Sequence, residues 1–372
     1  MTLSVVILNY KVPYFLQLCL QSVQRSLLNI NSEIIVVDNA SGDESLSMLK
    51  EHFPEVVVIA NSTNLGFSKA NNLGVKKAKG DYICILNPDT VLPENCFEDL
   101  LNFAEKKEKL GAVGVRLIDG TGIYLPESKR NLTTLKVSLK KITGDSSVYY
   151  ANQLAQDEVG EVPVLVGAFM FIRKKVYEEL CGFDEDFFMY GEDIDLSYRL
   201  IKKGYKNYYF GKITALHFKG ESSIRDKTYA KRFYGAMRIF NKKHFSKGRV
   251  TDTIINIFLR ILTYTFADTQ FKTKEAVVNS AVYLIKDLEK GLDNDFLYLE
   301  KPLKIIDLNL VKTKRIENCL VVFDFKSLQT EAIIGIMQML KNNQNRFRIR
   351  PSNCNFIAGS DSSADRGEIR TW

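Results

Sequence analysis

The sequence predicts an α/β fold, a mostly parallel sheet flanked by helices, with a C-terminal helical segment and a small α/β appendage. Short apolar runs rich in β-branched residues alternate with stretches of helical periodicity, and polar clusters follow several of the runs directly. This alternation is typical of a parallel sheet covered by helices on both faces. The 372 residues suffice for one large domain with an appendage.

The expected elements follow one another from the first residues. Residues 3–8 form a buried strand, and Pro13 begins a helix. Further strands are expected at 33–38, 56–60, 82–86 and 112–118, with helices from residues 43, 66 and 94. Residues 118–161 are irregular and polar. The alternation resumes with a strand and a helix over 162–184, a helix from the acidic turn 190–195 to Gly204, and two strands at 205–210 and 213–218.

We expect three parts along the chain: a domain of residues 1–250, a helical segment of residues 251–300 and an accessory α/β unit of residues 301–372. The helical segment is expected to hold two helices over 251–290. The accessory unit is expected to hold a strand at 320–325, a helix at 331–341, a strand at 347–350 and then a polar tail. Its sequence indicates no chemistry.

Composition excludes several classes of protein. Hydrophobic residues make up 45% and charged residues 26%, which excludes a disordered or collagen-like chain. Six cysteines are scattered without a CxxC pair, so neither a zinc site nor a disulfide framework is indicated. We find no signal peptide and no apolar stretch of 18 residues, so we expect no transmembrane helix. A cytoplasmic location is expected, with peripheral association at the inner face of the cell membrane.

Polar side chains follow three of the expected strands at the edge where ligands bind in such sheets. Asn9 and Asp38 end the first two strands, and Asn87 to Asp89 follow the fourth. Asp38 either caps a turn or accepts hydrogen bonds from a nucleobase or ribose. Asp89 either caps a turn or ligates Mg²⁺ or Mn²⁺, which prefer oxygen ligands.

Other segments carry groups suited to binding or catalysis. Asn64, Gly66 and Asn71 lie in a stretch whose glycine allows close backbone approach and whose amides suit a base edge. Glu192 and Asp193 begin a helix, where the helix dipole favours negative charge, or provide a general base. His217 ends a strand before a polar loop, where it is either an ordinary packed histidine or a ligand of a metal or phosphate.

The order of these segments resembles the family 2 glycosyltransferases of GT-A fold, and most nearly the rhamnosyltransferase-type enzymes of bacterial surface polysaccharide assembly. The resemblance covers about residues 1–250. It rests on SVVILNY, VVDNAS, NLGFSKANNLG, LNPDT, GAFMFIRKKVYEELCGFDEDFFMYGEDIDLSYR and HFKGESS, in that order.

The resemblance implies inverting transfer from a nucleotide-diphospho-sugar to a lipid-linked or polysaccharide acceptor, with a divalent metal, Mg²⁺ or Mn²⁺. It implies that Asp193 is the catalytic base, that Glu192 helps to bind the acceptor, and that Asp89 and His217 hold the metal or diphosphate. Asn87 stands where the full metal motif has its first aspartate, which weakens the expected metal site. The implied nucleotide-binding residues are Asn9, Asp38, Asn64, Gly66 and Asn71.

Two alternatives belong to other functional classes. A nucleotidyltransferase also uses aspartates at strand ends, but it usually has a glycine-rich basic loop after the first strand, and this chain has LNYKVPYF there. A non-catalytic module that binds nucleotide-sugars or glycans would release no nucleoside diphosphate in the presence of an acceptor.

The net charge of +7 is concentrated in one segment. Residues 225–249 carry nine Lys or Arg and one acid, a net charge of +8, so the rest of the chain is close to neutral. Tyr229, Phe233, Ala236 and Phe240 recur there at helical spacing. This stripe either packs on the catalytic domain or belongs to an interfacial helix on anionic lipid. No nucleic-acid-binding motif accompanies the charge, so nucleic acid is not an expected partner.

Overall fold

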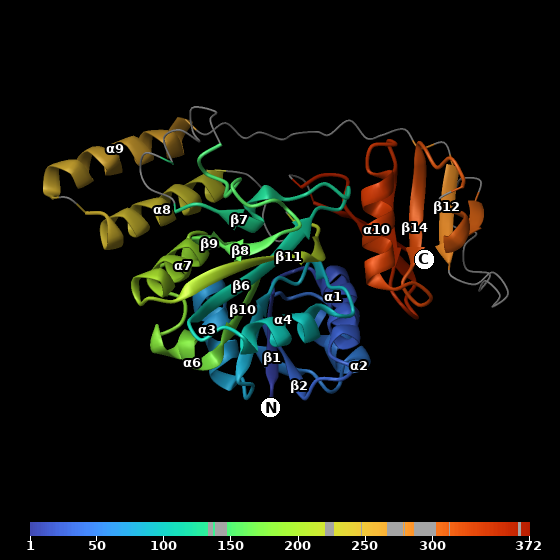
Figure 1. The fold of residues 1–372 in the computed structure, drawn as a ribbon, viewed down its shortest axis with the longest axis horizontal. Coiled ribbons are helices and arrows are strands. Elements are labelled where there is room, and N and C mark those ends of the chain that lie inside the picture. Colours follow the sequence, from blue (N-terminus) through green and yellow to red (C-terminus); the bar gives the residue numbers. More distant parts are fainter. Residues whose placement is uncertain are drawn as a thin grey trace.

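The computed structural model contains two large sheets and a short two-stranded one; the larger sheet is formed by strands up to residue 217, and the smaller large sheet by strands from residue 280 onward (Figure 1). The larger sheet has the strand order β3-β2-β1-β4-β10-β6-β11-β5, with β8 paired to β11. The smaller sheet has the order β13-β12-β14-β15-β16-β17. The structure describes residues 1–132, 137, 147–219, 227–246, 248–265, 278, 280–285, 303–311, 313–363 and 366–372.

The elements of the larger sheet appear in the order expected from the sequence. Its strands are β1 Leu3–Asn9, β2 Ser32–Asp38, β3 Val57–Ala60, β4 Tyr82–Leu86, β5 Thr90–Val91, β6 Leu110–Ile118, β8 Val159–Glu161, β10 Phe169–Arg173 and β11 Lys206–His217. The helices beside it are α1 Pro13–Ser26, α2 Ser45–His52, α3 Phe67–Lys77, α4 Cys96–Glu105, α6 Lys174–Glu179 and α7 Glu192–Lys202. A two-stranded sheet of β7 Lys129–Arg130 and β9 Val164–Leu165 lies next to them.

Both faces of the larger sheet are covered, as a run of apolar residues requires. Side chains alternate along β1, so Val5 and Ile7 pack on the face covered by α1, α2 and α4. Val6 packs on the opposite face, against α3, α6 and α7. The predicted fold class, a mostly parallel sheet flanked by helices, is therefore confirmed.

Two details of this sheet differ from the expectation. Strand β10 runs antiparallel to both of its neighbours, β4 and β6. The two strands expected at 205–210 and 213–218 are one strand, β11, whose register with β6 shifts between Phe210 and Thr214. Gly211 and Lys212 lie at this shift, and in the sequence such residues look like a break between strands.

The smaller sheet corrects the expected helical segment. Residues 251–290 were expected to form two helices; in the part of this range that the structure describes, helix α9 Arg249–Thr265 is followed by a strand, β12 Ser280–Ile285. Strand β12 pairs in parallel with β13 Leu303–Asp307 and β14 Cys319–Asp324. A short apolar run of this kind does not by itself distinguish a strand from a helix.

The expected C-terminal strands and helix are present, and the tail contains two more strands. Strand β14, helix α10 Thr330–Leu340 and strand β15 Arg346–Arg350 match the expected strand, helix and strand. Strands β14 and β15 pair in parallel. Strands β16 Phe356–Gly359 and β17 Glu368–Thr371 close the edge in antiparallel fashion, where only a polar tail was expected. The smaller sheet and α10, here called the C-terminal unit, pack against α1 through a shared apolar cluster that includes Phe15, Phe347 and Phe356.

Helices α8 Lys227–His244 and α9 extend beyond the larger sheet on the side away from the smaller sheet (Figure 1). Helix α8 occupies most of the segment expected to be helical and basic, although Arg225 and Lys247 lie outside the described residues. In the described part of the chain, no helix is long and apolar enough to cross a bilayer.

Candidate active site

A cavity of about 700 Å³ lies at the carboxyl ends of the central strands. Six of the nine residues predicted for the site line it, and three do not. The lining residues are Asn64, Gly66, Asp89, Glu192, Asp193 and His217.

Asn9, Asp38 and Asn71 lie behind the wall of the cavity. The Asn9 amide donates to Asp38 Oδ1 at 2.8 Å, to Ser41 Oγ at 3.1 Å and to Ser45 Oγ at 2.9 Å. Asp38 is only 1% exposed, so it holds the turn after β2 instead of presenting its carboxylate to the cavity. Asn71 donates to the Phe67 carbonyl within helix α3. Direct contact of these three side chains with a nucleotide was expected, and the structure places all three one layer deeper.

Asn39 provides an amide where Asp38 was expected to bind. Its Nδ2 donates to Asn64 Oδ1 at 2.9 Å, and its Oδ1 accepts from the Leu65 N–H at 2.9 Å. Asn39 and Asn64 both line the cavity, so two neutral amides lie beside each other near the ends of β2 and β3. Strand β2 ends at Asp38, and the residue after it, Asn39, lines the cavity in place of Asp38.

Position 66 requires a glycine, because its backbone φ is positive and because a side chain there would collide with Phe188. Its φ is +82°, and a Cβ there would lie 2.5 Å from the Phe188 carbonyl oxygen. The adjacent Phe67 N–H donates to that same carbonyl at 2.6 Å. Helix α3 therefore begins directly against the loop before α7, which fixes one wall of the cavity.

Asp89 and His217 come together because β5 pairs with the end of β11. His217 lies opposite Thr90 in this pairing, and its Nε2 is 3.4 Å from Asp89 Oδ1. The Lys219 N–H donates to Asp89 Oδ2 at 3.1 Å. His217 Nδ1 is buried and has no hydrogen-bond partner.

The donor set around Asp89 fits a divalent metal with two protein ligands. Asp89 Oδ1 and His217 Nε2, which lie 3.4 Å apart, are a carboxylate oxygen and an imidazole nitrogen of the kinds that bind Mn²⁺, and the carboxylate also suits Mg²⁺. Within the described residues no group of three or more His, Cys, Asp or Glu side chains is gathered as for a metal. A metal here would take its remaining ligands from phosphate oxygens and water.

Asp193 forms a buried ion pair with Arg130. Arg130 Nη2 lies 2.6 Å from Asp193 Oδ2, which also accepts from the Gly167 N–H at 3.0 Å. Arg130 Nη2 donates in addition to the Leu165 carbonyl at 2.6 Å. Burial alone lowers the pKa of Arg130, but Asp193 and Tyr149 outweigh burial and hold that pKa above its usual range. The Asp193 carboxylate is thus held in one orientation by the Arg130 guanidinium and the Gly167 N–H.

Glu192 has a different environment from its neighbour. It is 6% exposed, and its Oε2 is buried without a hydrogen-bond partner. Burial first, and then the negative charge of Asp193, raise the pKa of Glu192 to about 8. A carboxyl whose pKa is raised in this way keeps its proton at neutral pH and can donate a hydrogen bond.

Helix α8 forms another wall of the cavity. The apolar stripe of Tyr229, Phe233, Ala236 and Phe240 lines the cavity, so this stripe packs on the catalytic domain. His244, at the end of α8, lies with its Nε2 2.6 Å from Oδ1 of the fully buried Asp195, which also pairs with Arg199. Asp195 therefore attaches α8 to α7.

The sequence did not single out several cavity residues. Arg130 and Glu127 lie in the irregular stretch that showed no periodicity. Lys219 pairs with Glu127, and although burial pushes the pKa of Glu127 up, this ammonium outweighs it and lowers that pKa. A charged residue in a stretch without periodicity gives no sign in the sequence of what it will contact. Only the tertiary structure shows that these groups lie at the cavity.

Comparisons with known proteins show which family this chain is similar to. Residues 4–181 match the model of "Glycosyl transferase family 2". The N-acetylglucosaminyl-diphospho-decaprenol L-rhamnosyltransferase of Mycobacterium tuberculosis is 26% identical over 213 residues, which are 52% of this chain and 68% of that protein. The rhamnosyltransferase WbbL of Escherichia coli K12 is 24% identical over 63% of this chain and 94% of its own length.

Among solved structures, the mannosyltransferase PcManGT from Pyrobaculum calidifontis, in complex with GDP-Man and Mn²⁺, has a TM-score of 0.48. It is 16% identical and covers 70% of each chain.

Residues 4–181 form a family 2 glycosyltransferase domain, and the chain is a glycosyltransferase.

Proposed function

We propose that this glycosyltransferase moves a hexosyl group, rhamnose or another hexose, from a nucleotide-diphospho-sugar to a hydroxyl of a lipid-linked or polysaccharide acceptor, with inversion, in bacterial surface glycan assembly. The carrying observation is that one cavity holds both the Asp89–His217 pair and the Glu192–Asp193 pair. The two rhamnosyltransferase relatives support the substrate class, and the Mycobacterium relative is named for an acceptor of saccharide, diphosphate and polyprenol.

Asp193 is proposed as the base and Glu192 as an acceptor-binding group. The acceptor oxygen forms a bond to the anomeric carbon, the bond from that carbon to the diphosphate oxygen breaks, and the diphosphate leaves with the electron pair. The acceptor proton passes to Asp193, while Arg130 holds this carboxylate in place. Glu192, protonated at neutral pH, donates a hydrogen bond to an acceptor oxygen.

Asp89 and His217 are proposed to hold a divalent metal together with the donor diphosphate. The bound metal would neutralise the charge that develops on the leaving diphosphate. Lys219 and Arg232 also line the cavity and add positive charge for a diphosphate. Asn64 and Gly66, with Asn39, are proposed to contact the nucleotide, and Asn9, Asp38 and Asn71 to support that wall from behind.

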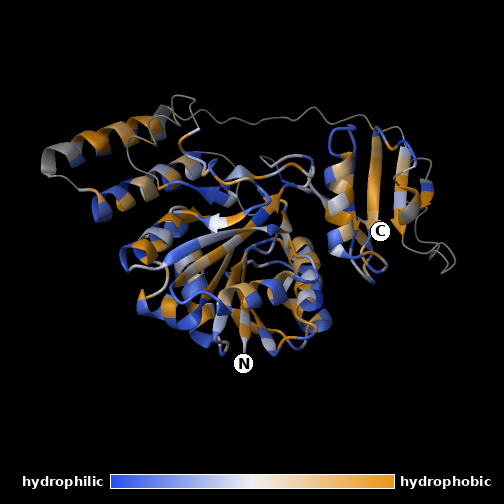
Figure 2. Cartoon of the chain, viewed as in Figure 1, coloured by the Kyte–Doolittle hydropathy of each residue, from blue (hydrophilic) through white to orange (hydrophobic). Residues whose placement is uncertain are grey.

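Helices α8 and α9 are proposed to rest on an anionic membrane surface, at the inner face of the cell membrane, and to present the cavity to a lipid-linked acceptor. Ile254, Ile257, Phe258, Ile261 and Tyr264 are exposed on α9 at helical spacing, and Figure 2 shows this helix as largely hydrophobic. In α8 and α9 the exposed cations include Lys227, Lys231, Lys242 and Arg260.

Some basic residues of the segment 225–249 contact other side chains of the protein and are therefore less able to contact lipid headgroups. Arg232 lies over the Phe188 ring at 4.8 Å and lines the cavity. Lys243 pairs with Asp184 and Asp186. The proposed membrane contact therefore depends on Lys231 and Lys242 more than on these two.

One assay distinguishes the proposal from its alternatives. Purified protein is incubated with Mn²⁺ or Mg²⁺ and dTDP-, UDP- or GDP-sugars, with and without a short-chain N-acetylglucosaminyl-diphospho-lipid. Acceptor-dependent release of nucleoside diphosphate, together with a product one hexose heavier, supports transfer. Nucleotide binding without turnover indicates a binding module, and pyrophosphate release from a nucleoside triphosphate and a sugar phosphate indicates a nucleotidyltransferase.

A further inference from the structure

The C-terminal unit is fixed on the catalytic domain by polar as well as apolar contacts. Gln21 exchanges two hydrogen bonds with Ser352, at 2.8 and 3.0 Å. Arg25 donates to the Leu328 carbonyl at 3.0 Å and lies over the Phe325 ring at 3.9 Å. A unit held at this many points keeps one orientation relative to the cavity.

Glu94 of the catalytic domain caps a helix of the C-terminal unit. Its Oε1 accepts from the Thr330 N–H at 2.8 Å, at the first turn of α10. A carboxylate at a helix N-terminus satisfies free N–H groups and matches the helix dipole. The first turn of α10 is therefore completed by a side chain of the catalytic domain.

The turn 360–363, between β16 and β17, extends from this unit toward the cavity. A Cβ at Gly120, just after β6, would overlap the Ser360 carbonyl oxygen. A Cβ at Gly122, whose φ is +82°, would lie 2.7 Å from the Met337 carbonyl oxygen. Ser363, at the end of this turn, lines the active-site cavity.

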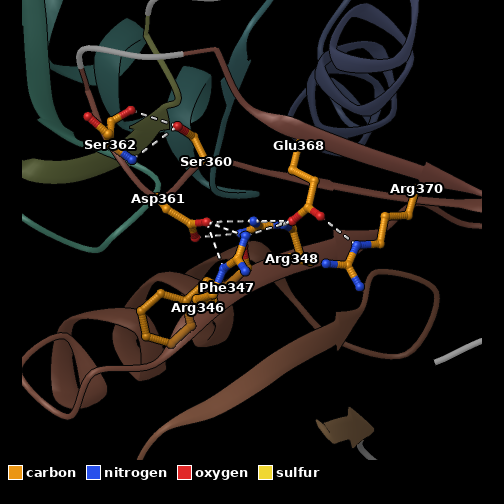
Figure 3. A network of polar contacts seen from close by, with 8 residues as sticks. All are labelled: Arg346, Phe347, Arg348, Ser360, Asp361, Ser362, Glu368 and Arg370. Carbon is orange, nitrogen blue, oxygen red and sulfur yellow. Dashed lines mark hydrogen bonds and ion pairs between the residues drawn. The ribbon is translucent and has the colours of Figure 1, made fainter. Parts of the chain in front are cut away.

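A buried ionic network holds the turn in place (Figure 3). Arg348, 1% exposed, donates to Asp361 Oδ1 and Oδ2, both at 2.9 Å, and to Glu368 Oε2 at 2.5 Å. Arg346 donates to Asp361 at 2.7 Å and to Glu368 at 2.9 Å. Figure 3 shows the carboxylates of Asp361, in the turn, and of Glu368, on β17, contacting the guanidinium groups of Arg346 and Arg348.

The network also removes charge from the turn. Burial by itself raises the pKa of Asp361 and of Glu368, but the arginines outweigh burial and lower both pKa values. The two carboxylates are thus paired with the buried guanidinium groups of Arg346 and Arg348, and Glu368 also with the more exposed Arg370. The described side chains that the turn offers beside Asp361 are serine hydroxyls, which suit the hydroxyls of an uncharged sugar better than a diphosphate.

The turn lies at the far side of the sheet from the nucleotide wall. Asn39 and Asn64 follow β2 and β3, whereas Gly120 follows β6, which is four strand positions from β2. At about 4.8 Å per strand the two places are separated by roughly 19 Å. A base bound at one does not reach the other.

We infer that the C-terminal unit forms part of the active site: Ser363, held by the Arg346–Arg348–Asp361–Glu368 network, is a specificity residue that hydrogen-bonds the sugar of the acceptor. This inference rests on the proposed glycosyl transfer and assigns the acceptor end of the same cavity.

Steady-state kinetics of Ser363→Ala and Ser363→Tyr test the inference with the N-acetylglucosaminyl-diphospho-lipid as acceptor. Loss of one hydrogen bond is expected to raise the acceptor KM about 2- to 10-fold, and the bulky tyrosine to raise it further. The donor KM and the acceptor-independent hydrolysis of the donor are expected to stay within about twofold. An unchanged acceptor KM, or an equal rise in donor KM, overturns the inference.

Asp361→Asn tests the supporting network. It is expected to raise the acceptor KM in the same direction as Ser363→Ala. Asn342→Tyr, at an exposed residue of the same unit, is the control and is expected to behave as the wild type.

A labelling experiment separates this inference from the proposed function. Cys181 is the exposed cysteine and the other five are buried, so Ser363→Cys in a Cys181→Ser background gives one accessible thiol. Maleimide labelling of this thiol is expected to slow with the N-acetylglucosaminyl-diphospho-lipid and not with UDP, GDP or dTDP. Wild-type transfer without such protection refutes the subsite alone, whereas absence of transfer by the wild type refutes the proposed function.

Discussion

The guanidinium of Arg130 lies 2.6 Å from the carboxylate of Asp193, and both side chains are buried beside the cavity. Arg130 comes from a short edge strand, β7, and Asp193 from the first turn of α7. The pair fixes the position of a carboxylate whose Oδ2 accepts two hydrogen bonds and whose Oδ1 accepts the Ile194 N–H at 2.8 Å. One lone pair of Oδ1 remains for an acceptor proton.

Asp193→Asn is expected to abolish transfer while the affinity for the nucleotide stays within a few fold. An amide cannot accept the acceptor proton, and a positioned base contributes about 10²–10⁴-fold to rate. Product formation is measured by mass spectrometry and nucleotide affinity by calorimetry. Glu98→Gln, at an exposed carboxylate on α4, is the control. Transfer by Asp193→Asn within a few fold of the wild type would exclude Asp193 as the base.

Glu192→Gln is expected to make stability less sensitive to pH. The folded protein keeps the Glu192 proton between about pH 4.5 and 8, whereas the unfolded chain releases it at about 4.5, so the unfolding free energy falls as pH rises through this interval. Glutamine has no proton to lose. Relative to wild type, the variant should gain at least about 1 kcal/mol between pH 5 and 8.

Denaturant unfolding at several pH values measures this gain, again with Glu98→Gln as the control. If the difference in unfolding free energy between Glu192→Gln and the wild type stays constant from pH 5 to 8, the pKa of Glu192 is not raised in the folded protein.

Removal of the proposed metal ligands is expected to uncouple the metal from nucleotide binding. With UDP, GDP or dTDP present, Mn²⁺ should raise the Tm of the wild type, since a ligand that binds the folded state stabilises it. Asp89→Asn and His217→Gln should reduce this Mn²⁺-dependent shift by at least half. His52→Gln, at an exposed residue at the end of α2, should leave it unchanged. An equal shift in all four proteins contradicts the assignment.

Gly120→Ala and Gly335→Ala are expected to have opposite effects on stability. The new methyl group at Gly120 meets the Ser360 backbone, which cannot move without displacing the turn 360–363, so we expect a loss of about 1–3 kcal/mol. Gly335 lies within α10 with open space around it, so alanine should stabilise by up to about 1 kcal/mol. Thermal unfolding compares the two, and destabilisation of both variants alike would contradict the tight docking at Gly120.

Membrane binding is expected to depend on both the charge of α8 and the apolar face of α9. The double variant Lys231→Glu/Lys242→Glu should sediment at least threefold less with vesicles that contain phosphatidylglycerol, since each basic residue near an anionic surface contributes about 1 kcal/mol. The double variant Ile254→Ser/Ile257→Ser should show a similar fall, because it removes apolar side chains that would be buried in the membrane surface. Leu28→Ser is the control, because Leu28 is an 80% exposed hydrophobe elsewhere. Equal sedimentation with neutral phosphatidylcholine vesicles would contradict an electrostatic contribution.

The sequence by itself determined most of the strands and helices of the catalytic domain and the polar residues at several of its strand ends. A strand buried on both faces must be continuously apolar, as in β1, and the polar residue that follows must lie at the ligand-binding edge. The motif order also indicated the family. These features are local, so they can be read from neighbouring residues.

Tertiary structure alone decided which of these residues meet. Asp89 and His217 are 3.4 Å apart because β5 pairs with β11, and Arg130 reaches Asp193 from a stretch without periodicity. The pairing of β12 within the C-terminal sheet, and the position of Ser363 in the cavity, likewise have no local signal. Contacts between segments far apart in sequence depend on how the elements pack, and a short apolar run or a polar turn is compatible with more than one packing.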